Sequence, residues 1–172
     1  FAALSNAAID SCREAYQGVR VELSSEVDPD LPVIHGNSSL LQSMVELLLK
    51  AEMAVLTYGS HVKVTVHSSK VSGVASGVQF IIEDDGQGAL IKTTREVLDA
   101  VAHRSGGAAQ PGTAVLAAYV IAAHHGGTVS VSEVDGGKTR ICIHLPLQPP
   151  ALNPDVAERS REFISKVLVN DS

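Results

Sequence analysis

The chain has 172 residues and a net charge of −6, and 45% of its residues are hydrophobic. This length corresponds to one domain with a sizeable core. The sequence has no cluster of Lys and Arg, so we expect no contact with nucleic acid or an anionic membrane surface. Cys12 and Cys142 are isolated, and the apolar runs are shorter than the roughly 18 to 20 residues of a membrane span. We therefore expect a reduced, cytoplasmic protein, and the start at Phe1 suggests an excised piece of a longer chain.

The N-terminal third predicts a helix, a strand and a second helix. Apolar residues recur at helical spacing over residues 4–16, and Gly18 follows as a stop signal. Residues 19–23 alternate apolar and polar side chains, as a half-buried strand does. Asn37 is placed to cap a helix over residues 37–56. The inner stripe of this helix consists of Leu40, Leu41, Met44, Leu47, Leu48, Ala51 and Val55.

The middle of the chain predicts two strands and then a long connection. Residues 62–66 and 78–82 alternate in polarity, with Gly73 and Gly77 in the turn between them. Residues 90–111 are polar and rich in glycine and alanine, with a short helix expected at residues 94–101. Long connections of this composition are typical of functional flaps.

The last part predicts a buried helix, two strands and a tail. Residues 113–124 are almost wholly apolar, Gly126 and Gly127 end that helix, and strands follow at residues 128–132 and 139–145. Several prolines mark a linker, and Asn153 with Pro154 begins a helix over residues 155–169. We expect one domain over residues 1–147, and a Pro-rich linker with an amphipathic helix over residues 148–172. That helix either packs on the domain or leads to a further domain or partner.

Tight turns between neighbouring strands predict antiparallel pairing, with the helices gathered on one face. The predicted fold class is an α/β two-layer sandwich with a mixed, mostly antiparallel sheet.

The strongest chemical signal is the segment that follows the strand at residues 78–82. Asp84 stands at the strand end, and Gly86 and Gly88 come directly after it. A carboxylate there accepts a hydrogen bond from an exocyclic amine, and bare glycine backbone lets a flat ring approach. The alternative is an acidic turn that only closes the strand. Gly112 precedes the apolar helix, and the free N–H groups at a helix start bind phosphate.

The order of these motifs resembles the ATP-binding catalytic domain of sensor histidine kinases, in the superfamily of gyrase, heat-shock chaperone and mismatch-repair ATPases. The resemblance covers residues 1–147, and its clearest parts are the first glycine box and the closing run at residues 126–146. It implies that Asp84 accepts the adenine amine, that Gly86 and Gly88 border the base, and that the Thr139 hydroxyl lies near the adenine.

The same resemblance implies a site for the phosphates of ATP or ADP. Gly112 and Thr113 would face the phosphates, and residues 90–111 would form the lid that closes over the nucleotide. The second glycine box keeps only its middle glycine, because Gln110 and Ala114 occupy the flanking positions. We therefore expect weak nucleotide binding, with ADP bound almost as well as ATP.

The resemblance implies two functional positions on the helix at residues 37–56. Glu46 stands where the family has a polar or acidic residue and would act as base or orienter. Lys50 stands where the family has a magnesium-binding asparagine. An ammonium group offers no lone pair at neutral pH, so we assign no metal ligand and expect the usual Mg²⁺ site to be missing. Lys50 either contacts the phosphates directly or forms a solvated ion pair with Glu46.

The activity that the resemblance implies is that of an ATP-dependent protein-histidine kinase in a two-component system. The domain would present the γ-phosphate to a histidine on a separate helical dimerisation domain, expected in the same parent chain, and a response regulator receiver domain would be a further partner. Lys50, Gln110 and Ala114 favour an alternative, a degenerate docking or regulatory module of a phosphorelay. A third alternative is a serine kinase of the anti-sigma-factor type. For the seven histidines we expect structural or surface roles.

Overall fold

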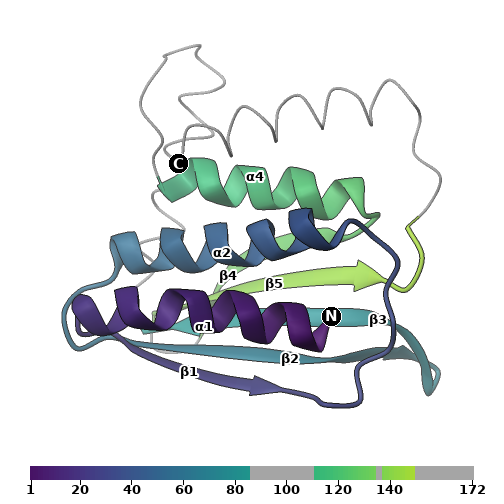
Figure 1. Ribbon diagram of the computed structural model, residues 1–172, viewed down its shortest axis with the longest axis horizontal. Coiled ribbons are helices and arrows are strands. Elements are labelled where there is room, and N and C mark those ends of the chain that lie inside the picture. Colours follow the sequence, from purple (N-terminus) through teal and green to yellow (C-terminus); the bar gives the residue numbers. More distant parts are fainter. Residues whose placement is uncertain (86–110, 135–136, 150–172) are drawn as a thin grey trace, which may run out of the picture.

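The computed structural model describes residues 1–85, 111–134 and 137–149. Three helices lie over one face of a five-stranded sheet, which gives two layers (Figure 1). The elements in chain order are α1 (Ala2–Gly18), β1 (Glu22–Val27), α2 (Ser38–Val55), β2 (His61–Val71), β3 (Val74–Asp84), α4 (Pro111–His124), β4 (Thr128–Val134) and β5 (Lys138–Pro146).

The strand order in the sheet is β1-β2-β3-β5-β4. The β1–β2 pair is parallel, because α2 carries the chain back between these strands, and the other three pairs are antiparallel. The predicted fold class, a mixed, mostly antiparallel sheet with helices on one face, is confirmed.

The core lies between the sheet and the helices. Alternate residues of the central strands point into it, and each is at most 1% exposed: Val62, Val64 and Val66 on β2, Val78, Phe80 and Ile82 on β3, and Ile141, Ile143 and Leu145 on β5. The helix α2 contributes a broad apolar stripe, and α4 buries Ala117, Ala118, Ile121 and Ala122. The apolar composition of α4 follows from this position against both the sheet and α2.

Two predicted boundaries were wrong. The predicted strand at residues 19–23 starts instead at Glu22, because α1 runs to Gly18 and the chain then turns at Arg20, whose φ is 56°. Val19 is 45% exposed in this turn. Gly77 lies inside β3 rather than in the hairpin turn, which falls at Ser72 and Gly73. Both strands of this hairpin are longer than the alternation predicted.

A buried histidine sets the alignment of α4 against α2. The Nδ1–H group of His125 donates to the carbonyl of Ile121 at 2.7 Å, and the backbone N–H of Asn37 donates to His125 Nε2 at 3.1 Å. Asn37 in turn caps α2, since its side-chain oxygen accepts from the N–H of Leu40. The C-terminal end of α4 therefore meets the N-terminal end of α2, and the start of α4 lies beside the end of α2 (Figure 1).

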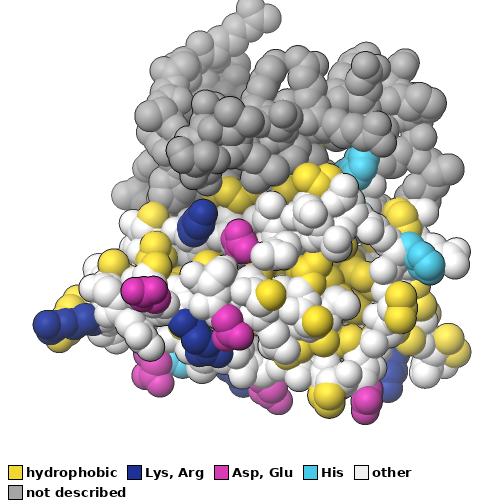
Figure 2. Space-filling view, viewed as in Figure 1, with side chains coloured by type: hydrophobic (Ala, Val, Ile, Leu, Met, Phe, Trp, Pro, Cys, Tyr) yellow, Lys and Arg dark blue, Asp and Glu magenta, His cyan; other side chains and the backbone are white. Residues whose placement is uncertain are grey.

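None of the described helices is long and apolar enough to span a membrane. The predicted helices at residues 94–101 and 155–169 lie outside the described residues. On the face shown in Figure 2, acidic and basic side chains are interspersed.

Candidate functional site

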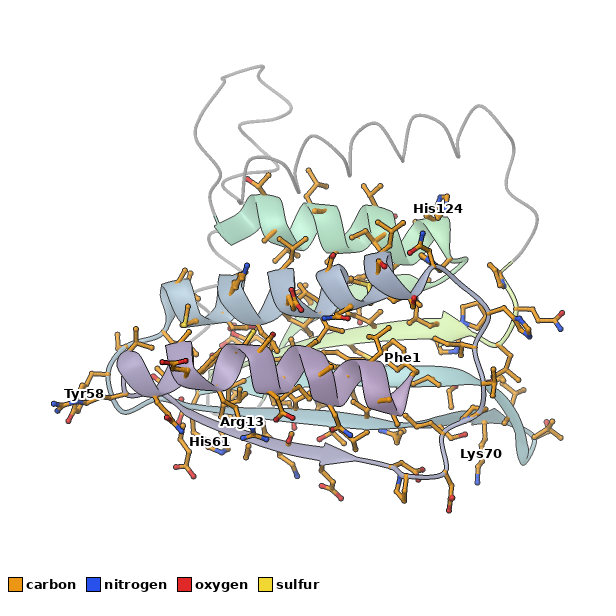
Figure 3. All side chains as sticks on the ribbon, viewed as in Figure 1. Phe1, Arg13, Tyr58, His61, Lys70 and His124 are labelled. Atoms are coloured by element: carbon orange, nitrogen blue, oxygen red, sulfur yellow. The ribbon has the colours of Figure 1, made fainter. Side chains whose placement is uncertain are left out.

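The site lies at the end of the molecule where α2 ends and α4 begins. The strand β3 ends and β5 starts at this same end. His61, the first residue of β2, is also here, and His124 at the last residue of α4 marks the opposite end (Figure 3).

Asp84 and Thr139 lie side by side at this end of the sheet. They are register partners on β3 and β5. Asp84 continues the buried face of β3 two residues beyond Ile82, so its side chain points toward the helices and is 3% exposed. Thr139 is fully buried. The pairing brings together two of the residues that the sequence predicted for base recognition.

The hydroxyl of Thr139 has no hydrogen-bond partner among the described residues. Buried polar groups are nearly always hydrogen-bonded. A hydroxyl both donates and accepts, so Thr139 suits a ligand that presents either kind of group beside Asp84.

The start of α4 faces the same end of the molecule. Gly112 lies in the first turn of the helix, and Thr113 follows it with a half-buried side chain. Pro111 is the first helical residue, a position at which proline is favoured because its missing N–H would be unpaired there. The N–H groups of the first turn and the positive end of the helix dipole make this a place where an anion is stabilised.

A third buried polar residue, Glu52 of α2, lies against Asp84. Glu52 is fully buried, and its carboxyl group makes a hydrogen-bonding contact with that of Asp84. No described donor reaches either oxygen of Glu52. Two ionised carboxylates have no proton to share, so this contact becomes a hydrogen bond only when one of them is protonated. Burial, followed by the charge and the hydrogen bond of Asp84, raises the pKa of Glu52 well above its usual value.

Glu52 was missed by the sequence reasoning, although the sequence carries a signal for it. Leu41, Val45, Leu48 and Glu52 follow one another at spacings of four, three and four residues, which place them on one face of α2. The first three are buried, so a carboxyl group at the fourth position is a charged residue in an apolar stripe. Such a residue requires a partner or a proton.

Tyr16 of α1 borders the same cluster. Its hydroxyl donates to the carbonyl of Leu49 at 2.7 Å. Burial raises the pKa of Tyr16, and the negative charges of Glu52, Cys12 and Asp84 raise it further. Tyr16 is therefore a neutral donor whose hydroxyl is already engaged.

Glu46 and Lys50 do not join this cluster. Glu46 accepts a hydrogen bond from the side chain of Gln42 at 2.9 Å, and Lys50 is exposed. Both charges act on the Cys12 thiol of α1, whose pKa is raised mainly by burial. At 100° per residue, Lys50 lies about 160° around α2 from Glu52, and therefore away from Asp84. None of the three ion pairs in the described residues joins Glu46 to Lys50.

The residues at the expected magnesium position do not fit that ion. Lys50 has no lone pair to offer. Leu47 and Ala51, next to Lys50 on the surface of α2, are buried apolar side chains and offer no ligand either. Among the described residues no group of three His, Cys, Asp or Glu side chains is placed to hold a metal ion.

The remaining predicted site residues stay predictions. Gly86, Gly88 and all but the last residue of the predicted lid lie outside the described residues, and so does Gln110. Ala114 lies within α4.

A hollow of about 180 Å³ opens at the same end of the sheet. His61, Lys63, Glu83, Asp84, Asp85 and Lys138 line it. The N–H of His61 donates to the carboxylate of Asp85 at 2.8 Å, and Arg140 donates to Glu83 at 2.8 Å through its Nε. The described residues that line the hollow thus carry both signs of charge.

Sequence comparison identifies one family. The profile of the histidine kinase-, DNA gyrase B-, and HSP90-like ATPases matches residues 36–149, a range that includes α2, Asp84, α4 and Thr139. No curated protein shows significant similarity to the sequence.

Structural comparison finds histidine kinase domains of the same fold. The catalytic domain of histidine kinase ThkA superposes with a TM-score of 0.64 at 12% identity, covering 86% of this chain and 93% of that one. The mycobacterial sensor histidine kinase MprB gives 0.64 at 19% identity, with 86% and 94% covered. The cytoplasmic segment of histidine kinase QseC gives 0.58 at 16% identity, with 84% and 74% covered. At these identities the likeness establishes the fold.

Proposed function

Because the chain belongs to the family of histidine kinase-, DNA gyrase B-, and HSP90-like ATPases, we propose that it is the ATP-binding domain of a sensor histidine kinase. The observation that carries this proposal is the buried pair of Asp84 and Thr139 beside the start of α4. A carboxylate and a hydroxyl that has no partner within the described part of the chain suit the edge of a purine, and a helix N-terminus suits phosphates.

Asp84 would accept a hydrogen bond from the adenine amine, and the Thr139 hydroxyl would bind beside it. Both groups are removed from water, which strengthens each hydrogen bond and makes a mismatched base costly. Gly86 and Gly88 would border the ring, as the resemblance implies.

The phosphates would extend from the base toward Gly112 and Thr113 at the start of α4. Support comes from the packing of α4 antiparallel to α2, which puts its positive end beside Asp84. Residues 90–111 connect the two halves of the site in sequence, and we propose that they act as its lid.

The domain would then present the γ-phosphate to a histidine on a separate helical domain, with a receiver domain as the next acceptor. Phosphoryl transfer depends mainly on positioning and on stabilising negative charge. Because Lys50 at the expected magnesium position offers no lone pair, we derive no step through a magnesium ion. Lys50 lies on the side of α2 away from Glu52 and Asp84, and Glu46 is bound to Gln42, so the roles of both residues at the phosphates stay predictions.

A second candidate is a nucleotide-responsive or docking module without kinase activity. The observation that favours it is on α2, where Lys50 and its buried apolar neighbours Leu47 and Ala51 offer no metal ligand. This candidate has the same fold as the kinase but does not transfer the γ-phosphate of ATP.

Calorimetric titration with ATP and ADP tests the proposed site. We expect both nucleotides to bind, and Asp84→Asn to weaken binding at least tenfold, because an amide presents a donor in one of the two acceptor positions. Asp85→Asn is the matched control, since Asp85 is exposed and an amide oxygen can still accept from His61. Equal binding by wild type and Asp84→Asn would contradict the base assignment.

Transfer of labelled γ-phosphate from ATP to a histidine of the helical domain separates the two candidates. Phosphoryl transfer by the wild type that is lost in Asp84→Asn supports the kinase proposal. Nucleotide binding without transfer, with the helical domain folded, supports the docking module.

A further inference from the structure

The contact between Glu52 and Asp84 joins the helix layer to the sheet at the centre of the proposed site. Glu52 comes from the last turn of α2 and Asp84 from the last position of β3. Both residues are buried, and their carboxyl groups meet within hydrogen-bonding contact. Two adjacent carboxyl groups removed from water do not both ionise at neutral pH, because their repulsion adds to the cost of burying each charge.

We propose that Glu52 is the positioning residue for Asp84: the two carboxyl groups share one proton across the contact between α2 and β3. The proton resides mainly on Glu52, whose O–H group donates to one oxygen of Asp84. Asp84 stays ionised, and its orientation is held from the helix layer. The role of Glu52 in base binding rests on the proposed function, whereas the shared proton does not.

The surroundings favour a single shared proton. Tyr16 faces the pair from α1 as a neutral phenol whose hydroxyl is bound to Leu49. Cys12, also on α1, is a buried thiol whose pKa is raised. Lys50 is exposed on the far side of α2, and Thr139 of β5 is uncharged. The first turn of α4 carries no titratable side chain. On the sheet side, the hollow beside Asp84 is lined by His61, Lys63, Glu83, Asp85 and Lys138, and Glu52 is not among its lining residues. Lys63 and Lys138 favour the ionised form of Asp84, which leaves the shared proton on the buried Glu52.

Burial raises the pKa of Glu52 well above that of an exposed glutamate. Below this pKa, a protonated Glu52 leaves one oxygen of Asp84 as acceptor for the base. Above it, the two carboxylates repel each other, the contact opens, and Asp84 loses its support. Nucleotide affinity should therefore fall as the proton is lost, even though Asp84 keeps its charge.

Infrared difference spectroscopy of the whole chain tests the shared proton without any nucleotide. We expect wild type at neutral pH to show the band of a protonated, buried carboxyl group. We expect the band to vanish in Glu52→Gln. In Asp84→Asn burial keeps Glu52 protonated, but its O–H group loses the carboxylate that accepts from it, so we expect the band to shift in frequency. Glu22→Gln, at an exposed position of β1, is the control that keeps the band. Absence of the band in wild type, its survival in Glu52→Gln, or an unshifted band in Asp84→Asn would overturn the inference.

ADP titrations across a pH series test the positioning role. We expect wild-type affinity to fall about tenfold or more from neutral to alkaline pH, while Glu52→Gln, whose amide keeps donating to Asp84, holds its affinity. Parallel pH profiles for the two proteins would overturn the positioning role. If Glu52→Gln does not fold, the infrared comparison of wild type with Asp84→Asn still tests whether the two carboxyl groups share a proton. A wild type that binds no ADP at any pH would contradict the proposed function, and the infrared band would still support or overturn the shared proton.

Discussion

At the scale of single residues, the site departs most from ordinary protein chemistry at Glu52. A glutamate in the apolar stripe of a helix is stable only when it is neutral or paired. Here its neighbour is another carboxyl group, so the stable form is the protonated one. This makes Glu52 a group whose titration is coupled to folding.

The free energy of unfolding should depend on pH through Glu52. Its pKa in the folded state lies above the ordinary value of 4.5, so the folded chain binds this proton more tightly than the unfolded chain does. The stabilisation is complete below 4.5 and is lost as the pH rises through the folded-state pKa, by at most about 1.4 kcal/mol per pH unit. Urea unfolding across pH should give a flatter curve for Glu52→Gln than for wild type. Glu22→Gln should follow wild type, and parallel curves for wild type and Glu52→Gln would contradict the prediction.

His125 is a second residue whose role is decided by its surroundings. Its two ring nitrogens bind the carbonyl of Ile121 and the N–H of Asn37, so it joins the end of α4 to the start of α2. A ring of this shape also fills the space above Gly36, where a Cβ atom would meet His125 Cδ2. His125 therefore has the structural role that the sequence predicted for the histidines.

His125→Ala should lower the free energy of unfolding by about 1 to 3 kcal/mol, because it empties the space that the buried ring fills beside Gly36 and removes the acceptor of the Asn37 N–H group. Chemical denaturation followed by circular dichroism measures the difference. His35→Ala is the control, since His35 is exposed, and it should change stability by less than about 0.5 kcal/mol. A loss in His125→Ala as small as that in His35→Ala would show that the buried ring of His125 contributes little.

At the scale of elements, close backbone approach between β3 and β5 limits the side chains that the sheet can hold. Gly77 pairs with Pro146 in register, and a Cβ atom on Gly77 would clash with the carbonyl oxygen of Leu145 and approach His144 Nε2. The glycine is therefore required by packing between strands rather than by a turn. This pairing keeps β3 and β5 aligned as far as Asp84 and Thr139 at their other ends.

Gly77→Ala should destabilise the fold by about 1 to 3 kcal/mol, because the added methyl forces the two strands apart. Gly18→Ala is the matched control at the end of α1, where an added Cβ meets nothing within 4 Å. That variant should be neutral or more stable by up to about 1 kcal/mol. Thermal unfolding measures both, and a neutral Gly77→Ala would contradict the packing argument.

At the scale of the whole molecule, the site is assembled from both layers. The sheet supplies Asp84 and Thr139, α2 supplies Glu52, and α4 supplies its N-terminal end. These segments are separated by long stretches of sequence, so a ligand that contacts several of them stabilises the folded state as a unit.

ADP should therefore raise the melting temperature of the chain. At a free concentration a hundredfold above Kd, the gain is about 2.7 kcal/mol, or roughly 5 to 10 °C for a domain of this size. Differential scanning fluorimetry measures the shift, with Asp84→Asn as the variant that should lose most of it and Asp85→Asn as the control that should keep it. Equal shifts in Asp84→Asn and wild type would place nucleotide binding elsewhere.

Local patterns in the sequence determined most of the fold. The stripe of α2, the alternation of the strands and the glycines after α4 predicted the elements, because burial on one side leaves a period in the sequence. The acidic strand end predicted a role of Asp84 in base recognition, which stays a prediction. The motif order predicted the family, which the profile match confirmed. The start of β1 was misplaced, since the positive φ of Arg20 has no local signal.

Only the tertiary structure decided which side chains meet. The alignment of α4 with α2, the contact of Glu52 with Asp84 and the direction of Lys50 away from them depend on how whole elements pack. Steps of 100° along a helix turn neighbouring residues toward different partners, so a motif that is contiguous in sequence is divided between two sides of α2. The hydrophobic periodicity of the sequence indicates that a residue is buried, whereas the packing of distant elements determines which group it contacts.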